Sequence, residues 1–205
     1  MKKKNIAILA EIGVMAALAL VFDMIASPWG FINGGSISIA MLPIVVVAVR
    51  RGLKAGLLAG LMLGVLQIVS SLRGLYILNF TQFLLDYILA FLVLGLAGVF
   101  KQALHKPLAL IASIALATFA RLIVASAAGV AYWSTYIPDG IANVDGVFGT
   151  SFTALLANPT AMTWIGSVVY NAAYLIPSAI LSILLALILQ GRGVLSINLE
   201  PTRKA

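Results

Sequence analysis

The stretch FLLDYILAF, residues 83–91, places one carboxylate, Asp86, among leucines and aromatic residues. A charged side chain at the centre of a bilayer costs about 2.5–3.5 kcal/mol on insertion scales, so an ionisable residue in an apolar segment indicates a functional site. Glu11, Asp23 and Arg121 occur in similar surroundings. Glu11 and Asp23 lie close to the two ends of their apolar segment, so we expect structural or interfacial roles for both.

Polar and aromatic residues at helical spacing accompany Asp86. Gln82 precedes it by one turn, and Tyr87 adjoins it. Residues four apart lie on one face of a helix, which predicts that Arg121, Ala125, Gly129 and Trp133 form a second stripe. The two faces together supply an acid, an amide, a phenol and an indole to one region of the protein.

A third segment extends this predicted site with Asn171, which has Tyr174 on its face and Tyr170 beside it. Aromatic walls around a carboxylate suit a flat cationic or nitrogen-rich ring, because a cation over an indole gains about 0.5–2 kcal/mol and the carboxylate adds a charge-assisted hydrogen bond. The other interpretation is a structural ion pair between Asp86 and Arg121. Their estimated depths in the membrane differ by roughly 10 Å at ~1.5 Å per residue, which favours the pocket.

The sequence carries no motif that is typical of catalysis. The only histidine, His105, lies between two apolar segments, and the HExxH, GxSxG and Walker A patterns are absent. Cysteine is also absent, which excludes disulfides and thiolate metal sites. We therefore expect no enzymatic activity, no metal site and no cofactor bound by this chain.

The composition is that of an integral membrane protein, with 62% apolar and 9% charged residues against about 45–50% and about 25% in soluble domains. Continuous apolar segments favour helices over a β-barrel, whose strands alternate. We expect an all-α bundle of six transmembrane helices in a single membrane domain, residues 1–205. The second span is short and contains Pro43, which predicts a kinked or steeply placed helix. The predicted spans are 6–27, 37–49, 53–72, 80–100, 108–133 and 162–190.

Most of the 13 basic residues lie on one predicted side of the membrane. They precede the first span, follow the sixth, and separate the second from the third and the fourth from the fifth. Because basic residues concentrate in cytoplasmic loops, both termini should be cytoplasmic. The net charge of +7 then reflects membrane orientation, and we expect no nucleic-acid partner. A cleavable signal peptide is disfavoured, since its removal would break this charge pattern.

Small residues and one polar stretch complete the predicted organisation. Residues 134–160 form the longest non-apolar stretch, which we expect to be an external loop that either covers the site or merely connects two spans. Small residues four apart let helix backbones approach closely. The third span has four such glycines, for which we favour packing within the chain over contact with another subunit: Gly52, Gly56, Gly60 and Gly64. In the first span we expect a partner's helix to dock on Ala10, Gly13 and Ala17.

Five motifs in this order resemble a known family. They are GGSISIAMLPI (34–44), RRGLKAG (50–56), LLDYILAF (84–91), the spaced Arg121, Gly129 and Trp133, and YNAAYLIPS (170–178). Together they resemble the thiamine-specific substrate-binding subunit, or S component, of energy-coupling-factor (ECF) transporters. The resemblance extends over all six predicted spans.

The resemblance implies a six-helix protein of the bacterial plasma membrane that captures a vitamin from outside the cell. Its partners would be a transmembrane coupling subunit and two ATPase subunits, and ATP would be used by those subunits. The residues that match the family's substrate site are Tyr76, Asp86, Tyr87, Gly129, Trp133 and Asn171. Among them, Trp133 would stack on the ligand while Asp86 would balance charge or accept hydrogen bonds.

Two positions depart from the family pattern, since Ala125 stands where the family has histidine and Gly166 where it has tyrosine. Each change should remove a ring from the pocket, so a pyridoxine-like or hydroxymethylpyrimidine-like vitamin is an alternative ligand. An alternative function is a self-sufficient secondary transporter, in which Asp86 and Arg121 form a proton-linked switch. The lack of a visible internal repeat argues against that alternative.

Overall fold

The structure is a computed structural model that describes residues 3–70 and 77–196. Every regular element in these two ranges is helical, which confirms the predicted all-helical class. We write η2 for a π-helix and the other η labels for 3-10 helices. The elements are α1 (Lys3–Ala26), η1 (Ser27–Trp29), α2 (Met41–Arg51), α3 (Leu53–Ser70), α4 (Phe80–Phe83), η2 (Leu84–Leu89), α5 (Ala90–Leu92), η3 (Val93–Val99), α6 (Pro107–Tyr132), η4 (Ser134–Tyr136), α7 (Ile137–Phe148), α8 (Phe152–Leu155), α9 (Pro159–Gly191) and η5 (Val194–Ser196).

Five helical stretches in the described ranges are long and apolar enough to cross a membrane. They agree with the first, third, fourth, fifth and sixth predicted spans. The fourth is composite, because α4, η2, α5 and η3 follow one another without a break; we call it the Phe80–Val99 run. The five stretches are Asn5–Trp29, Leu53–Ser70, Phe80–Val99, Pro107–Tyr132 and Pro159–Gly191.

The predicted second span has a different structure. Its first residues, 37–40, are not helical, and α2 has only 11 residues, or about 16 Å of helix. Pro43 lies in the first turn of α2, where backbone N–H groups have no intrahelical acceptor, so the predicted kink is wrong. Gly52 ends the helix with a φ of 86°, a conformation that glycine adopts without strain. Gly52 therefore does not belong to the α3 stripe.

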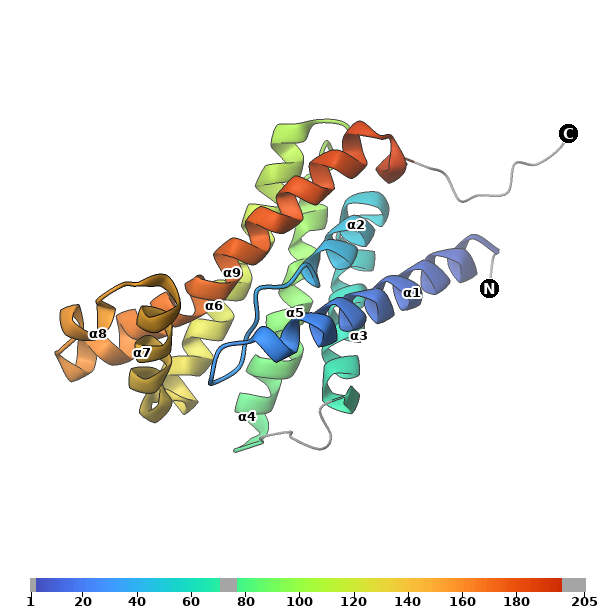
Figure 1. Cartoon of the computed structure of the whole chain (residues 1–205). Coiled ribbons are helices and arrows are strands. Elements are labelled where there is room, and N and C mark those ends of the chain that lie inside the picture. The colour runs from blue at the N-terminus through green and yellow to red at the C-terminus, as the bar shows by residue number, and fades with distance from the viewer. Residues whose placement is uncertain (1–2, 71–76, 197–205) are drawn as a thin grey trace, which may run out of the picture.

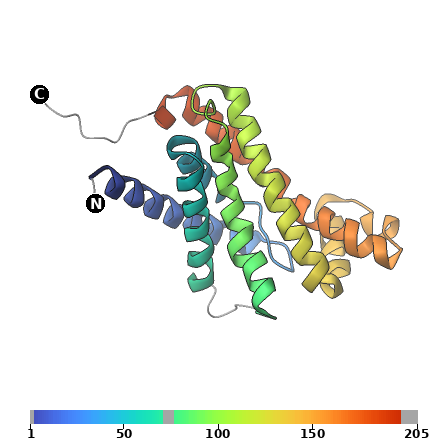
Figure 2. The ribbon, with the colours of Figure 1, turned by 180° about the vertical axis from the view of Figure 1, so that it is seen from behind.

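Helix α2 is the core of the bundle. The outer helices form a row in which each contacts the next, in the order α1, α3, the Phe80–Val99 run, α6 and α9, and α2 contacts all of them. Figure 2 shows α3, the run and α6 side by side. Residues 41–48 of α2 are all buried. A helix that is apolar on every side belongs in an interior, and here other helices cover it.

Glycines on α3 set how closely the run packs. A Cβ at Gly56 would collide with Ala48 of α2, and Cβ atoms at Gly60 and Gly64 would collide with backbone carbonyls of the run. Close helix approach of this kind depends on small side chains. For these three glycines, the interpretation as packing within the chain is confirmed.

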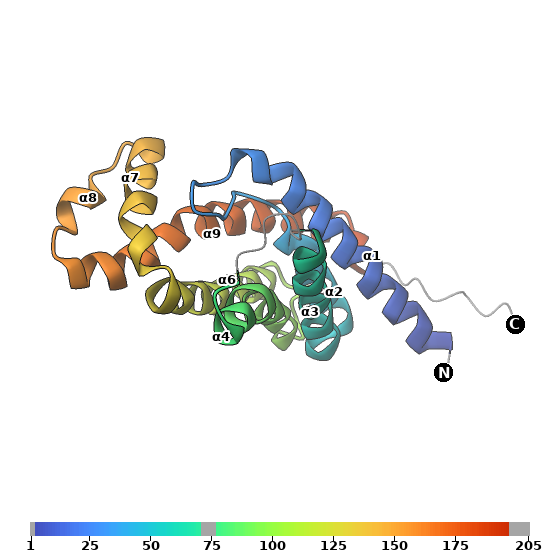
Figure 3. The same ribbon diagram turned by 90° about the horizontal axis from the view of Figure 1, so that it is seen from below.

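The stretch 134–160, which we expected to be a loop, is mostly helical. It contains η4, α7 and α8, which lie beside the start of α9 and away from the start of α1 (Figures 1 and 3). Asp145 joins α7 to α8 by accepting hydrogen bonds from the Thr150 hydroxyl at 2.6 Å and from the Phe152 and Thr153 N–H groups, both at 2.8 Å. These bonds, the Thr150 hydroxyl first, hold the pKa of Asp145 far below its ordinary value.

Candidate functional site

The bundle contains a cavity of about 670 Å³, a volume typical of small-molecule sites (roughly 300–1,000 Å³). Its walls come from α1, residues 27–40, the first residue of α2, α3, the Phe80–Val99 run, α6, η4, the first residue of α7 and α9. Tyr76 lies outside the described residues. The other predicted substrate-binding residues all line this cavity: Asp86, Tyr87, Gly129, Trp133 and Asn171.

Asp86 lies on the π-helix η2, an element that occurs frequently at functional sites. Its Oδ2 accepts hydrogen bonds from Gln82 Nε2 at 2.7 Å and from Trp133 Nε1 at 2.8 Å. The first bond follows from the one-turn spacing seen in the sequence. The second joins the run to the end of α6. Asp86 is therefore held in place through one carboxylate oxygen.

The stripe on α6 lies along the cavity wall, since Arg121, Ala125, Gly129 and Trp133 all line it. Within the described residues Arg121 makes no ion pair with Asp86, and its guanidinium carbon lies 4.6 Å from the centre of the Phe91 ring. The interpretation of Asp86 and Arg121 as a structural ion pair is therefore wrong for this structure. The cation–π contact keeps the charge of Arg121 at the cavity instead.

Asn171 is fixed by its own helix and lines the cavity from α9. Its Nδ2 donates to the Ser167 carbonyl at 2.8 Å, and its Oδ1 accepts from the Tyr174 hydroxyl at 2.6 Å. Gly129 faces this region from α6, where a Cβ would collide with the Ser167 hydroxyl. Gly129 therefore lets α6 and α9 approach, and the two helices bring Trp133 and Asn171 to one cavity.

The segment between η1 and α2 forms part of the wall, a role that the sequence did not reveal. The Tyr170 hydroxyl donates to the Gly34 carbonyl at 2.6 Å, and Asn33 Nδ2 donates to the Tyr136 carbonyl at 2.8 Å. Gly35, with a φ of 81°, packs so closely on the Tyr174 ring that a Cβ would collide with it. These contacts join the segment to η4 and α9.

Asp23 is a second carboxylate on the cavity wall, where we had expected a structural or interfacial role. Its Oδ2 accepts a hydrogen bond from Gln67 Nε2 of α3 at 2.5 Å. From the sequence, Asp23 was placed only near the end of a span. In the structure α1 packs on α3, and Asp23 lies at the cavity beside Gln67 of α3.

The two departures from the family pattern lie in different places. Ala125 lines the cavity, as expected for a position where a ring has been removed. Gly166 faces α7 instead, where a Cβ would meet Ile137 first and then Met162 and Ile141. In this structure Gly166 serves the packing of α7 on α9, and the expectation that it removes a ring from the pocket stays a prediction.

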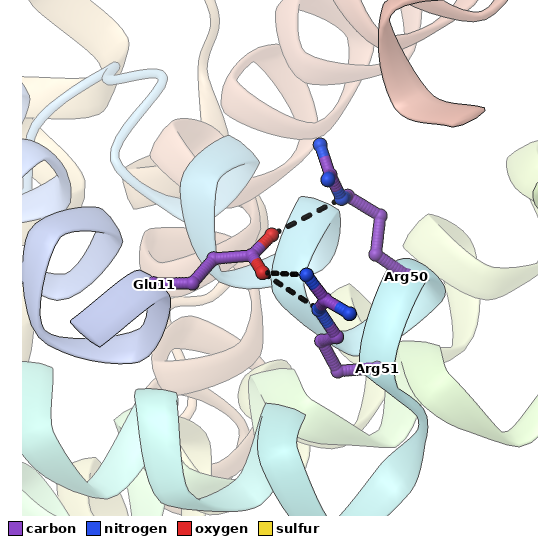
Figure 4. Close-up of polar contacts among 3 residues, drawn as sticks. All are labelled: Glu11, Arg50 and Arg51. Carbon is purple, nitrogen blue, oxygen red and sulfur yellow. Dashed lines mark hydrogen bonds and ion pairs between the residues drawn. The ribbon is translucent and has the colours of Figure 1, made fainter. Parts of the chain in front are cut away.

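Glu11 lies outside the cavity, in a buried ion cluster that joins α1 to the end of α2 (Figure 4). Its Oε1 lies 3.1 Å from Arg50 Nε, and its Oε2 accepts from Arg51 Nε at 2.6 Å. This confirms a structural role for Glu11. Two arginines at the C-terminal end of α2 also complement the partial negative charge of a helix terminus.

The predicted docking face lies on the open side of α1. Ala10 and Ala17 are exposed, and Gly13 is half-buried with Met62 Cε 3.8 Å from the position of a Cβ. The larger residues Val14, Leu18 and Val21 are also exposed on this helix. Their exposure leaves an apolar face open to lipid or to another helix.

The family model described as "Thiamine transporter protein (Thia_YuaJ)" matches residues 9–154, which is most of the chain. The chain belongs to the thiamine transporter family. This confirms the resemblance seen in the sequence. It also identifies the chain as a multi-pass membrane transporter rather than an enzyme.

Individual members of the thiamine transporter family are similar over much of their length. The thiamine transporter ThiT of Bacillus subtilis (strain 168) is 32% identical over 187 residues, 88% of each chain. ThiT of Lacticaseibacillus paracasei is 29% identical over 150 residues, 67% of this chain and 73% of that protein. A solved structure of ThiT from Listeria monocytogenes has a TM-score of 0.70 and 27% identity, covering 93% of this chain and 96% of that one.

Proposed function

We propose that this chain binds thiamine in the cavity and acts as the substrate-capture subunit of an ECF-type importer. Thiamine joins an aminopyrimidine to a thiazolium ring through a methylene group, so it has two flat rings, is rich in nitrogen and carries one positive charge. The observation that carries the proposal is Asp86, fixed beside Trp133 on a wall that Tyr87 and Asn171 continue. Membership of the thiamine transporter family supports the same ligand.

Each side chain then has a distinct role. Asp86 balances positive charge or accepts hydrogen bonds from the ligand, and the indole of Trp133 stacks on a ring. Asn171 and Tyr87 orient the bound ring, together with Tyr76 from outside the described residues. Gly129 contributes by keeping α6 close to α9.

The membrane arrangement that we propose has one membrane domain, residues 1–205, with both termini in the bacterial cytoplasm. The lysines at residues 2–4, at the start of α1, and the basic residues after α9 support this orientation. The non-helical residues 37–40 and α2 would together form a sixth, irregular crossing. Other helices cover α2, as irregular membrane segments require.

The partners that we propose are the transmembrane coupling subunit and two ATPase subunits, which use the ATP. The coupling subunit would dock a helix on Ala10, Gly13 and Ala17. Exposure of Ala10 and Ala17 in this structure supports that face. A self-sufficient transporter with an Asp86–Arg121 switch is less well supported, because Arg121 stacks on Phe91 instead.

The test is thiamine binding to the purified full-length chain, measured by isothermal titration calorimetry in detergent. We expect saturable one-site binding, with pyridoxine and hydroxymethylpyrimidine competing weakly. Tighter binding of either competitor would reassign the ligand. Uptake is measured in liposomes with and without the ATPase module, and uptake by the chain alone under a proton gradient would overturn the capture-subunit proposal.

A further inference from the structure

Asp23 and Gln67 form a polar pair on the cavity wall that the family resemblance did not assign to the ligand. Asp23 projects from α1 and Gln67 from α3, and both line the same cavity as Asp86. Gln67 is buried and Asp23 is half-buried. Their hydrogen bond, from Gln67 Nε2 to Asp23 Oδ2, is 2.5 Å long.

The two carboxylates of the cavity are held in the same way. A glutamine amide donates to one oxygen of each, Gln67 to Asp23 and Gln82 to Asp86. Among the described residues, the second oxygen of each carboxylate has no hydrogen bond. A fixed carboxylate with one open oxygen is arranged to accept a hydrogen bond from a ligand or to attract a cation.

Comparison with Glu11 indicates that Asp23 does not serve packing alone. Glu11, on the same helix, faces two arginines, which compensate the cost of removing its charge from water. Asp23 has no cationic partner within the part of the chain described here, and a neutral glutamine is its only hydrogen-bond donor there. Among the described residues, no ion pair therefore offsets the cost of removing the Asp23 charge from water, and a cation in the cavity could do so.

The charged groups of the lining support this assignment. Within the described ranges, the cavity has two carboxylates, Asp23 and Asp86, and one cation, Arg121. These three described residues sum to a formal charge of one negative unit, which complements a ligand with one positive charge. Without the Asp23 charge, their sum would be zero.

We propose that Asp23, positioned by Gln67, is a second ligand-binding carboxylate and determines the preference of the cavity for a cationic ligand. This inference rests on the proposed function. The inference goes beyond the proposed function by assigning the selectivity for a charged ligand to the cavity wall formed by α1 and α3. A ligand of the same shape without the positive charge should not depend on Asp23.

The experiment compares two ligands on the full-length chain by calorimetry: thiamine, and its neutral isostere in which a thiophene replaces the thiazolium ring. Asp23→Asn keeps the size of the side chain and an acceptor for Gln67, and removes the charge. We expect it to weaken thiamine about tenfold or more and to leave the isostere unchanged. The matched control is Asp139→Asn, which removes one exposed carboxylate of α7 outside the cavity lining; it should change neither affinity.

Binding of the isostere also reports that the variant is folded. Equal loss of both ligands in Asp23→Asn would overturn the inference, because Asp23 would then act through shape. Unchanged thiamine affinity would overturn it as well. If the unmodified chain binds neither ligand, the proposed function fails instead, so the two failures are distinguishable.

Discussion

Replacing Asp86 with asparagine should weaken thiamine binding while preserving the fold. The two hydrogen bonds that Asp86 receives from described residues, Gln82 and Trp133, end on the same oxygen, Oδ2. The amide oxygen of asparagine can occupy that position and accept both bonds. The cavity then keeps its shape, while the negative charge is lost and the open oxygen is replaced by an amide donor.

The size of the effect follows from the surroundings of this carboxylate. Removing one partner of a desolvated charge pair costs about 2–5 kcal/mol. Because Asp86 is only half-buried and lines an open cavity, we take the lower limit, about 2 kcal/mol, which is a roughly 30-fold increase in Kd. Trp133→Phe keeps an aromatic ring and removes one donor to Asp86, so we expect about 1 kcal/mol, or roughly fivefold.

The assay is calorimetric titration of thiamine into each purified variant, with the melting temperature as a control for folding. Asp86→Asn should melt within a few degrees of the unmodified chain. Unchanged thiamine affinity in this variant would refute the assignment of Asp86 to the site. A larger loss in Trp133→Phe than in Asp86→Asn would show that the indole N–H contacts the ligand rather than serving mainly to hold Asp86.

Three further predictions concern packing and docking. Glu11→Gln should lower stability by about 3 kcal/mol, measured by thermal unfolding in detergent, because both arginines lose a buried counterion; an unchanged melting temperature would contradict this. Gly60→Ala should lower the melting temperature through collision with a backbone carbonyl, whereas Gly146→Ala, with open space around it, should not; equal effects would contradict the packing argument. Replacing Gly13 and Ala17 together with leucine should abolish uptake in cells that supply the ATPase module and leave thiamine affinity intact; equal loss of both would mean that the face packs internally.

Helical spacing predicted the parts of the site that lie on one helix. Gln82 and Asp86 are one turn apart, and their hydrogen bond follows directly from that spacing. The same holds for Asn171 and Tyr174 on α9. A spacing argument needs only a continuous helix. The π-helix η2 begins between Gln82 and Asp86, and the hydrogen bond between these two residues still forms.

Features that depend on tertiary packing could not be predicted in this way. Hydropathy does not show which residues of the predicted second span are helical, or that other helices surround α2. The stretch that contains α7 was expected to be a loop because it is the longest non-apolar one, and glycine costs about 1 kcal/mol in a helix. In the structure a Cβ at Gly140 would meet the ring of Tyr170, so the packing of α7 on α9 explains the glycine at this position.

Helix α3 links the packing of the bundle to the chemistry of the cavity. A Cβ at Gly64 would collide with the carbonyl of Tyr87, the residue after Asp86. Gln67 follows Gly64 by three residues on nearly the same face, and it holds Asp23. The distance at which α3 packs against the Phe80–Val99 run therefore affects the positions of both Asp86 and Asp23. A side chain added at Gly64 should impair binding of a cation although it removes no group from the cavity.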